Sequence, residues 1–310
     1  MAADLVPETK KLDTEDAWEV LRRVRYVPLL KKSMLRFRRA DGYSYARAVA
    51  FAVVLTAFPA LIFLVAFAVW LGSGELQSSV DAILTTLTPG STSAFFQQAV
   101  EQGQSGARSN GLAMLAGGMA ALTSGAVGMS QIQQGAGRLY GKDEDRSFLH
   151  RYALSLALSL SVGLLLSAAF VAIAFGGAIT DALQGQSPWA WLRWPLGAVA
   201  VAVALAVLYQ VAPNRDQPGV SWLIVGGITA TVLWLLFSGG LAGYLTLSST
   251  FGDTYGRLAG LIGFFLWAQL SGLAVLAGLA FAAQLEAERA VQVGVTEDLQ
   301  REARNSRSAR

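Results

Sequence analysis

The residues with the potential for chemistry in this sequence are few and lie far apart. The chain has no cysteine and a single histidine, His150, so it offers no thiol nucleophile and no histidine cluster for a metal. Its acidic residues are dispersed over loops and termini, whereas metal-dependent hydrolysis of RNA needs carboxylates or imidazoles gathered around the ions. We therefore expect no enzyme, no metal site and no cofactor, and we exclude a ribonuclease on the same argument.

Uncharged polar side chains in long apolar segments are the remaining candidates for a site. No Asp, Glu, Lys, Arg or His falls in the core of these segments, so coupling through an intramembrane carboxylate is not expected. A glutamine in such a segment should bond to another helix or line a hydrated groove, and both interpretations stay open. Pro59 predicts a kink, with Thr56 placed to bond a freed carbonyl. The candidate groove or kink residues are Pro59, Thr56, Gln131, Gln134, Gln210, Trp234 and Gln269.

The elements that must position these residues are the apolar segments themselves. The chain has 310 residues, of which 54% are hydrophobic and 15% charged, and this is too apolar for a soluble domain of that length. A spanning helix needs about 20 mostly apolar residues. The stretches that satisfy this are 48–72, 111–134, 152–178, 194–212, 220–246 and 257–284. The sequence therefore predicts an all-α fold, a polytopic membrane bundle of six transmembrane helices.

The basic residues predict the orientation of this bundle. If the N-terminus is cytoplasmic, all but three of the 24 Lys and Arg fall on the inside, the exceptions being Arg108, Arg193 and Arg257. This asymmetry is the positive-inside pattern and favours N- and C-termini that are both cytoplasmic. Trp222 is then expected at the inner membrane interface, where amphipathic rings prefer to lie.

Three regions follow from these patterns. Residues 1–47 predict two basic amphipathic helices, broken at Pro28, at the membrane surface, where anionic lipid headgroups are the expected partner and nucleic acid is not. Residues 48–285 form the transmembrane domain, and its first outer loop, 73–110, predicts short helices that lie on the surface or cap a cavity. Residues 286–310 predict a disordered basic tail.

Small residues recur at spacings of four along two of the predicted spans. Such stripes let helix backbones approach closely in lipid, so a packing role is favoured over a pore lined by backbone. The predicted packing residues are Ala113, Gly117, Ala121, Gly125, Gly256, Gly260 and Gly263.

Four stretches, taken in order, resemble the YihY/BrkB family of six-span bacterial inner-membrane proteins, some of which carry the label ribonuclease BN. They are YARAVAFAVVLTAFPALIFLVA, SGAVGMSQIQQGAGRLYGKDEDRSFLHR, APNRDQPGVSWLIVGGITATVLWLLFSGGLAGYL and FGDTYGRLAGLIGFFLWAQLSGLAVLAGLAFAAQLEAE. The resemblance covers about residues 35–287. It implies a multi-pass protein of the bacterial plasma (inner) membrane but little chemistry, because the family has no agreed biochemical activity.

Two functions stay open at this point. The first is transport or handling of an uncharged or amphiphilic, lipid-like substrate, which requires a continuous cavity touched by Pro59, Gln131, Trp234 and Gln269. The second is a structural or partner-binding membrane protein in which the same residues only hold helices together. The sequence offers neither a nucleophile paired with a base nor a cluster of metal ligands, so an intramembrane enzyme is not expected. Protein partners are not readable from the sequence, and a homo-oligomer is left open.

Overall fold

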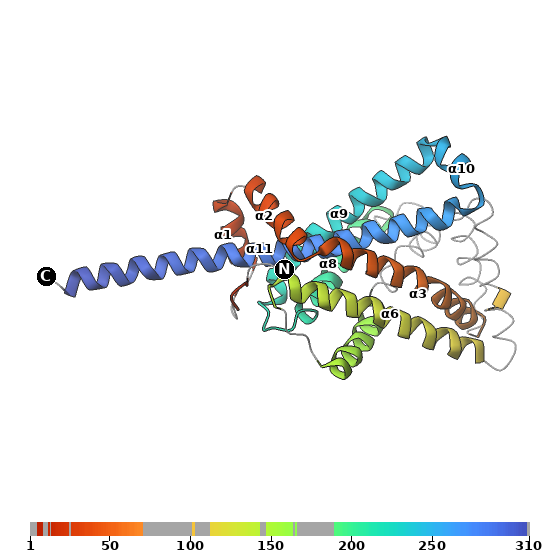
Figure 1. The fold of residues 1–310 in the computed structure, drawn as a ribbon, viewed down its shortest axis with the longest axis horizontal. Helices are drawn as coiled ribbons and strands as arrows, with labels where there is room; N and C mark the ends of the chain where they lie inside the picture. The colour runs from red at the N-terminus through yellow and green to blue at the C-terminus, as the bar shows by residue number, and fades with distance from the viewer. Residues whose placement is uncertain are drawn as a thin grey trace.

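The computed structural model describes residues 5–8, 12, 14–24, 26–70, 101–102, 112–142, 147–163, 165 and 189–308, and every regular element within these ranges is helical. The elements are α1 (Thr14–Arg23), α2 (Tyr26–Arg39), α3 (Gly42–Trp70), α6 (Leu112–Leu139), α8 (Trp189–Val211), α9 (Val220–Leu247), α10 (Ser249–Tyr255), the 3-10 turn η1 (Gly256–Leu258) and α11 (Ala259–Ser308) (Figure 1). A further helix covers 148–163. The predicted all-α fold is confirmed for this part of the chain.

Three of the described helices are long and apolar enough to cross a membrane, by length and composition: Gly42–Phe63, Val220–Leu247 and Ala259–Gln292. Helices α6 and α8 coincide with the predicted spans 111–134 and 194–212. Most of the predicted span 152–178 lies outside the described residues. So does nearly all of the first outer loop, with its predicted short helices. The full set of six spans therefore stays a prediction.

Helix α11 is the element around which the others pack. It contacts α9, α3 and α2, while α3 packs along α6 and α8 along α9. Figure 1 shows α11 running through the molecule and projecting beyond it at one end, and α1 and α2 lie at that same end of the bundle. The α9–α10 hairpin and the α3–α6 pair converge there and diverge toward the opposite end. We call the end where the helices converge the inner end.

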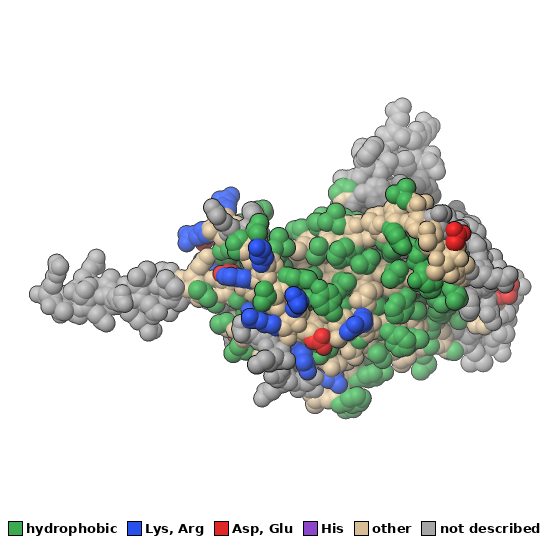
Figure 2. Space-filling model, turned by 45° about the horizontal axis from the view of Figure 1, so that its top comes forward, with side chains coloured by type: hydrophobic (Ala, Val, Ile, Leu, Met, Phe, Trp, Pro, Cys, Tyr) green, Lys and Arg blue, Asp and Glu red, His purple; other side chains and the backbone are tan. Residues whose placement is uncertain are grey.

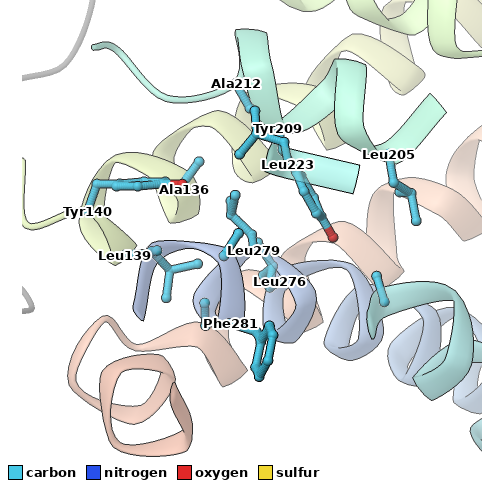
Figure 3. Close-up of a cluster of buried hydrophobic side chains, with 14 of the residues drawn as sticks. Ala136, Leu139, Tyr140, Leu205, Tyr209, Ala212, Leu223, Leu276, Leu279 and Phe281 are labelled. Carbon is cyan, nitrogen blue, oxygen red and sulfur yellow. The ribbon is translucent and has the colours of Figure 1, made fainter. Parts of the chain in front are cut away.

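The inner end also holds the hydrophobic core. Figure 3 shows side chains of α8, α9 and the end of α6 gathered around Leu276 and Leu279 of α11. The largest fully buried side chains are Trp222, Tyr140, Tyr209, Leu29, Leu139, Leu208, Leu223, Leu276, Leu279, Leu285, Glu286 and Val6. This set includes Val6 and Leu29, so the N-terminal region is part of the core rather than an appendage to it.

The two N-terminal helices pack against the bundle through their apolar faces. Helix α1 buries Ala17 and Val20, and α2 buries Leu29 and Phe37. Helix α1 ends at Arg23 and α2 begins at Tyr26, so the break comes before Pro28 rather than at it. Pro28 lies in the first turn of α2, where its missing N–H breaks no helical hydrogen bond. The location of these helices at a membrane surface stays a prediction.

Helix α11 continues to Ser308, which differs from the disordered tail expected over 286–310. The sequence after Gln292 is rich in helix-forming Ala, Glu, Gln and Arg, and Glu297 precedes Arg301 by four residues, a spacing that supports a helix. Because a helix is costly to start but easy to extend, these residues continue the helix that the apolar span has already formed.

Close helix contacts occur at several of the glycines. A Cβ at Gly117 of α6 would lie 3.2 Å from both the carbonyl oxygen of Pro59 and the amide nitrogen of Phe63 in α3. Gly125 faces the side chain of Ser159. Ala121 is half-buried on the same helix, and Ala113 lies in its first turn.

The predicted stripe at the start of α11 behaves differently. A Cβ at Gly263 would lie 3.4 Å from Leu245, and Gly260 is half-buried in α11. Gly256 instead lies in the η1 turn with φ +48°, and an added Cβ there would meet no atom of the described chain within 4 Å. A glycine at this position is therefore explained by the positive φ of the turn rather than by helix packing.

Candidate functional site

Pro59 and Thr56 lie in the middle of α3, which stays helical across both residues. The Thr56 hydroxyl donates to the carbonyl oxygen of Ala52 at 2.7 Å. The carbonyl that loses its usual donor to Pro59 is that of Leu55, so Thr56 does not satisfy it as the sequence suggested. Pro59 is half-buried against α6, where its own carbonyl faces Gly117.

The predicted glutamines fall into two groups. Gln134 donates to the backbone and hydroxyl oxygens of Ser130 on its own helix, both at 3.3 Å, and Gln131 is half-buried. Gln210 of α8 and Gln269 of α11 differ, because the side-chain oxygen of each is buried with no hydrogen-bond partner among the described residues. These two amides therefore each present a buried oxygen that can accept a hydrogen bond.

Trp234 belongs to a reciprocal contact between α9 and α11. Its indole N–H donates to Ser271 at 3.0 Å, while the indole N–H of Trp267 donates to Ser238 at 3.1 Å. The two rings meet edge to face with centroids 6.2 Å apart. Such a pair adds packing energy beyond the area it buries, so this contact fixes how α9 lies on α11.

Two hollows in the described part of the chain lie away from the predicted groove residues. One is on the surface of α1 and another is between α2 and α11. None of Pro59, Gln131, Trp234 and Gln269 lines either of them. The continuous cavity stays a prediction.

The inner end contains a buried charged cluster that sequence reasoning did not single out. Arg215 follows α8 and donates to Glu286 of α11 at 2.6 Å, with the two side chains 1% and 0% exposed. The guanidinium also lies over the ring of Tyr140, 4.5 Å from its centroid. Ion pairs buried to this extent need further hydrogen bonds to offset desolvation.

The N-terminal segment 5–8 supplies some of those hydrogen bonds. Arg215 donates to the carbonyl oxygens of Val6 and Pro7 at 3.2 and 3.1 Å. The Val6 amide donates to the carbonyl of Tyr140 at 3.1 Å, and Lys142 pairs with Glu8 at 2.7 Å. Segment 5–8 thus ties the loop after α6 to the loop after α8 and covers the ion pair.

Electrostatics at this end follow from burial and from the nearby charges. Burial raises the pKa of the Tyr140 hydroxyl above its ordinary value, and the negative charge of Glu286 raises it further. The hydrogen bond from Lys142 lowers the pKa of Glu8. The Gln217 amide lies near the Tyr140 hydroxyl, yet neither completes a hydrogen bond within the described residues. Tyr140 therefore stays neutral and protonated at physiological pH.

A second buried cation, Arg36 of α2, lies close by. It donates to the side-chain oxygen of Gln284 at 2.9 Å and to the carbonyl of Leu139 at 3.0 Å. Gln284 in turn donates to Glu288, which pairs with Lys32 of α2 at 2.6 Å. This chain of polar contacts joins α2 to α11 and to the end of α6.

One signal in the sequence pointed toward the charged cluster. Glu286 and Arg215 belong to the stretches that carry the family resemblance, but nothing in those stretches indicates that the two residues pair. Their pairing depends on contacts between residues 71 positions apart, which periodicity does not reveal. Within the described ranges, no three His, Cys, Asp or Glu residues are gathered closely enough to hold a metal.

Several of the described helices are long and apolar, and their membrane-length segments carry no charged residue in their cores. Basic side chains gather at one end of the molecule. These features define an integral membrane protein. Comparison with known proteins then gives the family: residues 33–304 match the family model described as virulence factor BrkB, and the chain belongs to this family. The recognition made from the four sequence stretches is confirmed.

Relatives of known sequence agree with this assignment. The ribonuclease-like protein YfkH of Bacillus subtilis (strain 168) is 25% identical over 257 residues, which cover 80% of this chain and 92% of YfkH. A UPF0761 membrane protein of Alkalilimnicola ehrlichii is 29% identical over 79% of this chain, and one of Nitrosospira multiformis is 28% identical over 87%. The chain spans 55% and 64% of the length of these two proteins. No solved structure matches the fold.

Proposed function

We propose that this protein transports or handles an uncharged or amphiphilic, lipid-like molecule within the bacterial inner membrane. The observation that carries the proposal is the pair of buried side-chain oxygens of Gln210 and Gln269, which have no partner among the described residues. A buried polar atom without a partner costs about 1–3 kcal/mol. A hydroxyl or amide group of a bound molecule would offset that cost.

The two amides lie at different depths of the same bundle. Tyr209, next to Gln210, donates to the carbonyl of Val275 at 2.5 Å, so Gln210 is level with residue 275 of α11. Gln269 lies six residues before that point, about 9 Å along the helix axis at 1.5 Å per residue. Acceptors at successive depths, in spans whose cores carry no Asp, Glu, Lys, Arg or His, suit a molecule with uncharged polar groups.

Hydrogen bonds join the helices at the inner end. Arg215 there contacts Glu286 and the carbonyls of Val6 and Pro7 in segment 5–8. Under the proposal, a substrate reaches the amides from the diverging end or laterally from lipid, and release toward the cytoplasm requires segment 5–8 to detach. The orientation that this implies has six spans, both termini in the cytoplasm and α1 and α2 on anionic lipid headgroups.

Lipid translocation in proteoliposomes tests the proposal. The full chain is reconstituted with a phospholipid that carries a fluorescent tail, and the loss of outer-leaflet fluorescence after addition of an impermeant reductant measures transfer. We expect the wild-type chain to accelerate transfer and Gln269→Leu to slow it several-fold. Thr123→Val is the matched control, because Thr123 is exposed and bonds only to its own helix. Equal rates for the two variants would contradict a role for Gln269.

The alternative is a structural or partner-binding membrane protein without transport activity. The Trp234–Ser271 and Trp267–Ser238 contacts favour it, because they lock α9 to α11 near the predicted groove. A wild-type chain that inserts and folds but moves no lipid of any headgroup class would support this alternative.

A further inference from the structure

The hollow between α2 and α11 lies apart from the buried amides. Its volume is about 380 Å³, and it sits at the inner end of the predicted span 257–284. The residues that line it are Lys32, Leu35, Arg36, Arg39, Gln284, Ala287, Glu288 and Val291. Neither the translocation proposal nor the family assignment gives this hollow a role.

Basic side chains are prominent among the described residues that line the hollow. They are Lys32, Arg36 and Arg39, and the carboxylate among these described residues is that of Glu288. Arg36 is only 7% exposed, and its contacts include hydrogen bonds to the side chain of Gln284 and to the carbonyl of Leu139. An arginine fixed in this way presents its guanidinium at little further entropic cost, and the planar guanidinium matches the oxygens of a phosphate.

The mouth of the hollow is apolar. Leu35 is 50% exposed and Val291 63% exposed, which is unfavourable for side chains that face water. The outer face of α2 continues this surface with Val27, Leu30 and Met34, all exposed. Figure 2 shows Lys and Arg side chains gathered at this end of the molecule beside hydrophobic ones. Apolar and basic side chains mixed in this way are typical of helices at the boundary between headgroups and acyl chains.

We propose that this hollow binds the phosphate headgroup of an anionic membrane phospholipid, with the acyl chains lying against Leu35 and Val291. The phosphate then lies near Arg36, Arg39 and Lys32, and its negative charge complements these basic side chains. The inference rests on the proposed position of α2 at the membrane surface, and it does not depend on lipid transport.

Lipid titration of the full-length protein in detergent tests this site. Dioctanoyl phosphatidylglycerol is added to the purified chain, and its apparent affinity is obtained from the rise in the thermal unfolding midpoint. Dioctanoyl phosphatidylcholine has the same chains without net charge. We expect the glycerol lipid to stabilise the chain at concentrations at least tenfold lower than the choline lipid does.

Two double variants of the same helix locate the binding. Lys32→Gln with Arg39→Gln removes two charges from the hollow, while Lys31→Gln with Arg38→Gln removes two exposed charges outside it. We expect the first pair to weaken phosphatidylglycerol binding at least tenfold and the second less than threefold. Equal effects would show diffuse attraction to the basic helix and would overturn the site.

The source of the phosphate is tested in the same titration. Inorganic phosphate that stabilises the chain as well as phosphatidylglycerol would overturn the lipid assignment in favour of a soluble anion. Lipid translocation in proteoliposomes is read separately. A chain that moves no lipid but shows the charge-selective titration refutes only the transport proposal, and the reverse result refutes only this site.

Discussion

The buried ion pair of Arg215 and Glu286 makes the sharpest prediction about stability. Glu286→Gln keeps the size of the side chain but leaves the guanidinium of Arg215 charged, 1% exposed and without its carboxylate. Removing one partner of a buried pair costs about 3–5 kcal/mol. We expect the free energy of unfolding to fall by an amount in that range, a large part of the stability of a typical domain.

A double-mutant cycle separates the charge from other contacts. Arg215→Met also removes the hydrogen bonds to the carbonyls of Val6 and Pro7, so alone it should cost at least as much as Glu286→Gln. The double variant contains no unpaired buried charge, so its cost should fall below the sum of the two single costs. We expect a coupling energy of about 2 kcal/mol, within the range for residues in direct contact.

The assay is unfolding of the purified chain in mixed micelles with increasing sodium dodecyl sulfate, followed by tryptophan fluorescence. The matched control is Glu8→Gln, because Glu8 and Lys142 form an ion pair whose side chains are 37% and 31% exposed. Exposed pairs contribute little, so the control should be far less destabilising than Glu286→Gln. Equal losses for Glu286→Gln and Glu8→Gln, or full additivity in the cycle, would refute the reasoning.

Two further predictions concern segment 5–8 and the helix contacts. Lys142 lowers the pKa of Glu8 from its ordinary value of 4.5. Their contact is therefore fully present above pH 4.5 and is lost as the pH falls through the lowered pKa. Hydrogen exchange of the Val6 amide, corrected for intrinsic rates, should then become faster. Gly278→Ala should lower the free energy of unfolding by about 1–3 kcal/mol, because its Cβ would lie 2.7 Å from a carbonyl of α9. In the same unfolding assay Gly240→Ala, with open surroundings among the described residues, should be neutral or stabilising, and the opposite order would contradict the packing argument.

Helix positions were readable from the sequence where composition and chain-breaking residues act locally. The predicted span 220–246 matches α9, Val220–Leu247, because an apolar run begins directly after Pro218-Gly219 and remains uncharged over its whole length. Helix α11 begins at Ala259, close to the predicted start at 257, because Gly256 with φ +48° opens the η1 turn Gly256–Leu258. Local patterns therefore located these long helices but not the short helix α10, Ser249–Tyr255.

Trp222 shows why the inner end could not be predicted in the same way. An interfacial position follows from its side-chain type, yet in the structure it is 0% exposed. At the adjacent Gly219, an added Cβ would lie 3.2 Å from the carbonyl of Leu12, so the N-terminal region covers the start of α9. Contacts between residues about 200 positions apart create this core, and neither side-chain type nor periodicity carries that information.

The basic residues make the same point for the candidate lipid site. Counting Lys and Arg predicts the side of the membrane, but it treats every cation as an equivalent solvated charge. Lys31 and Lys32 are neighbours on one helix, yet only Lys32 reaches α11, where Glu288 binds it. Arg36, one turn further along, is buried and donates to the side-chain oxygen of Gln284 and to the carbonyl of Leu139. The packing of α2 against α11 therefore places some of these basic side chains around a hollow. Comparing the Lys32/Arg39 double variant with the Lys31/Arg38 double variant measures how much of the affinity for anionic lipid is specific to that hollow.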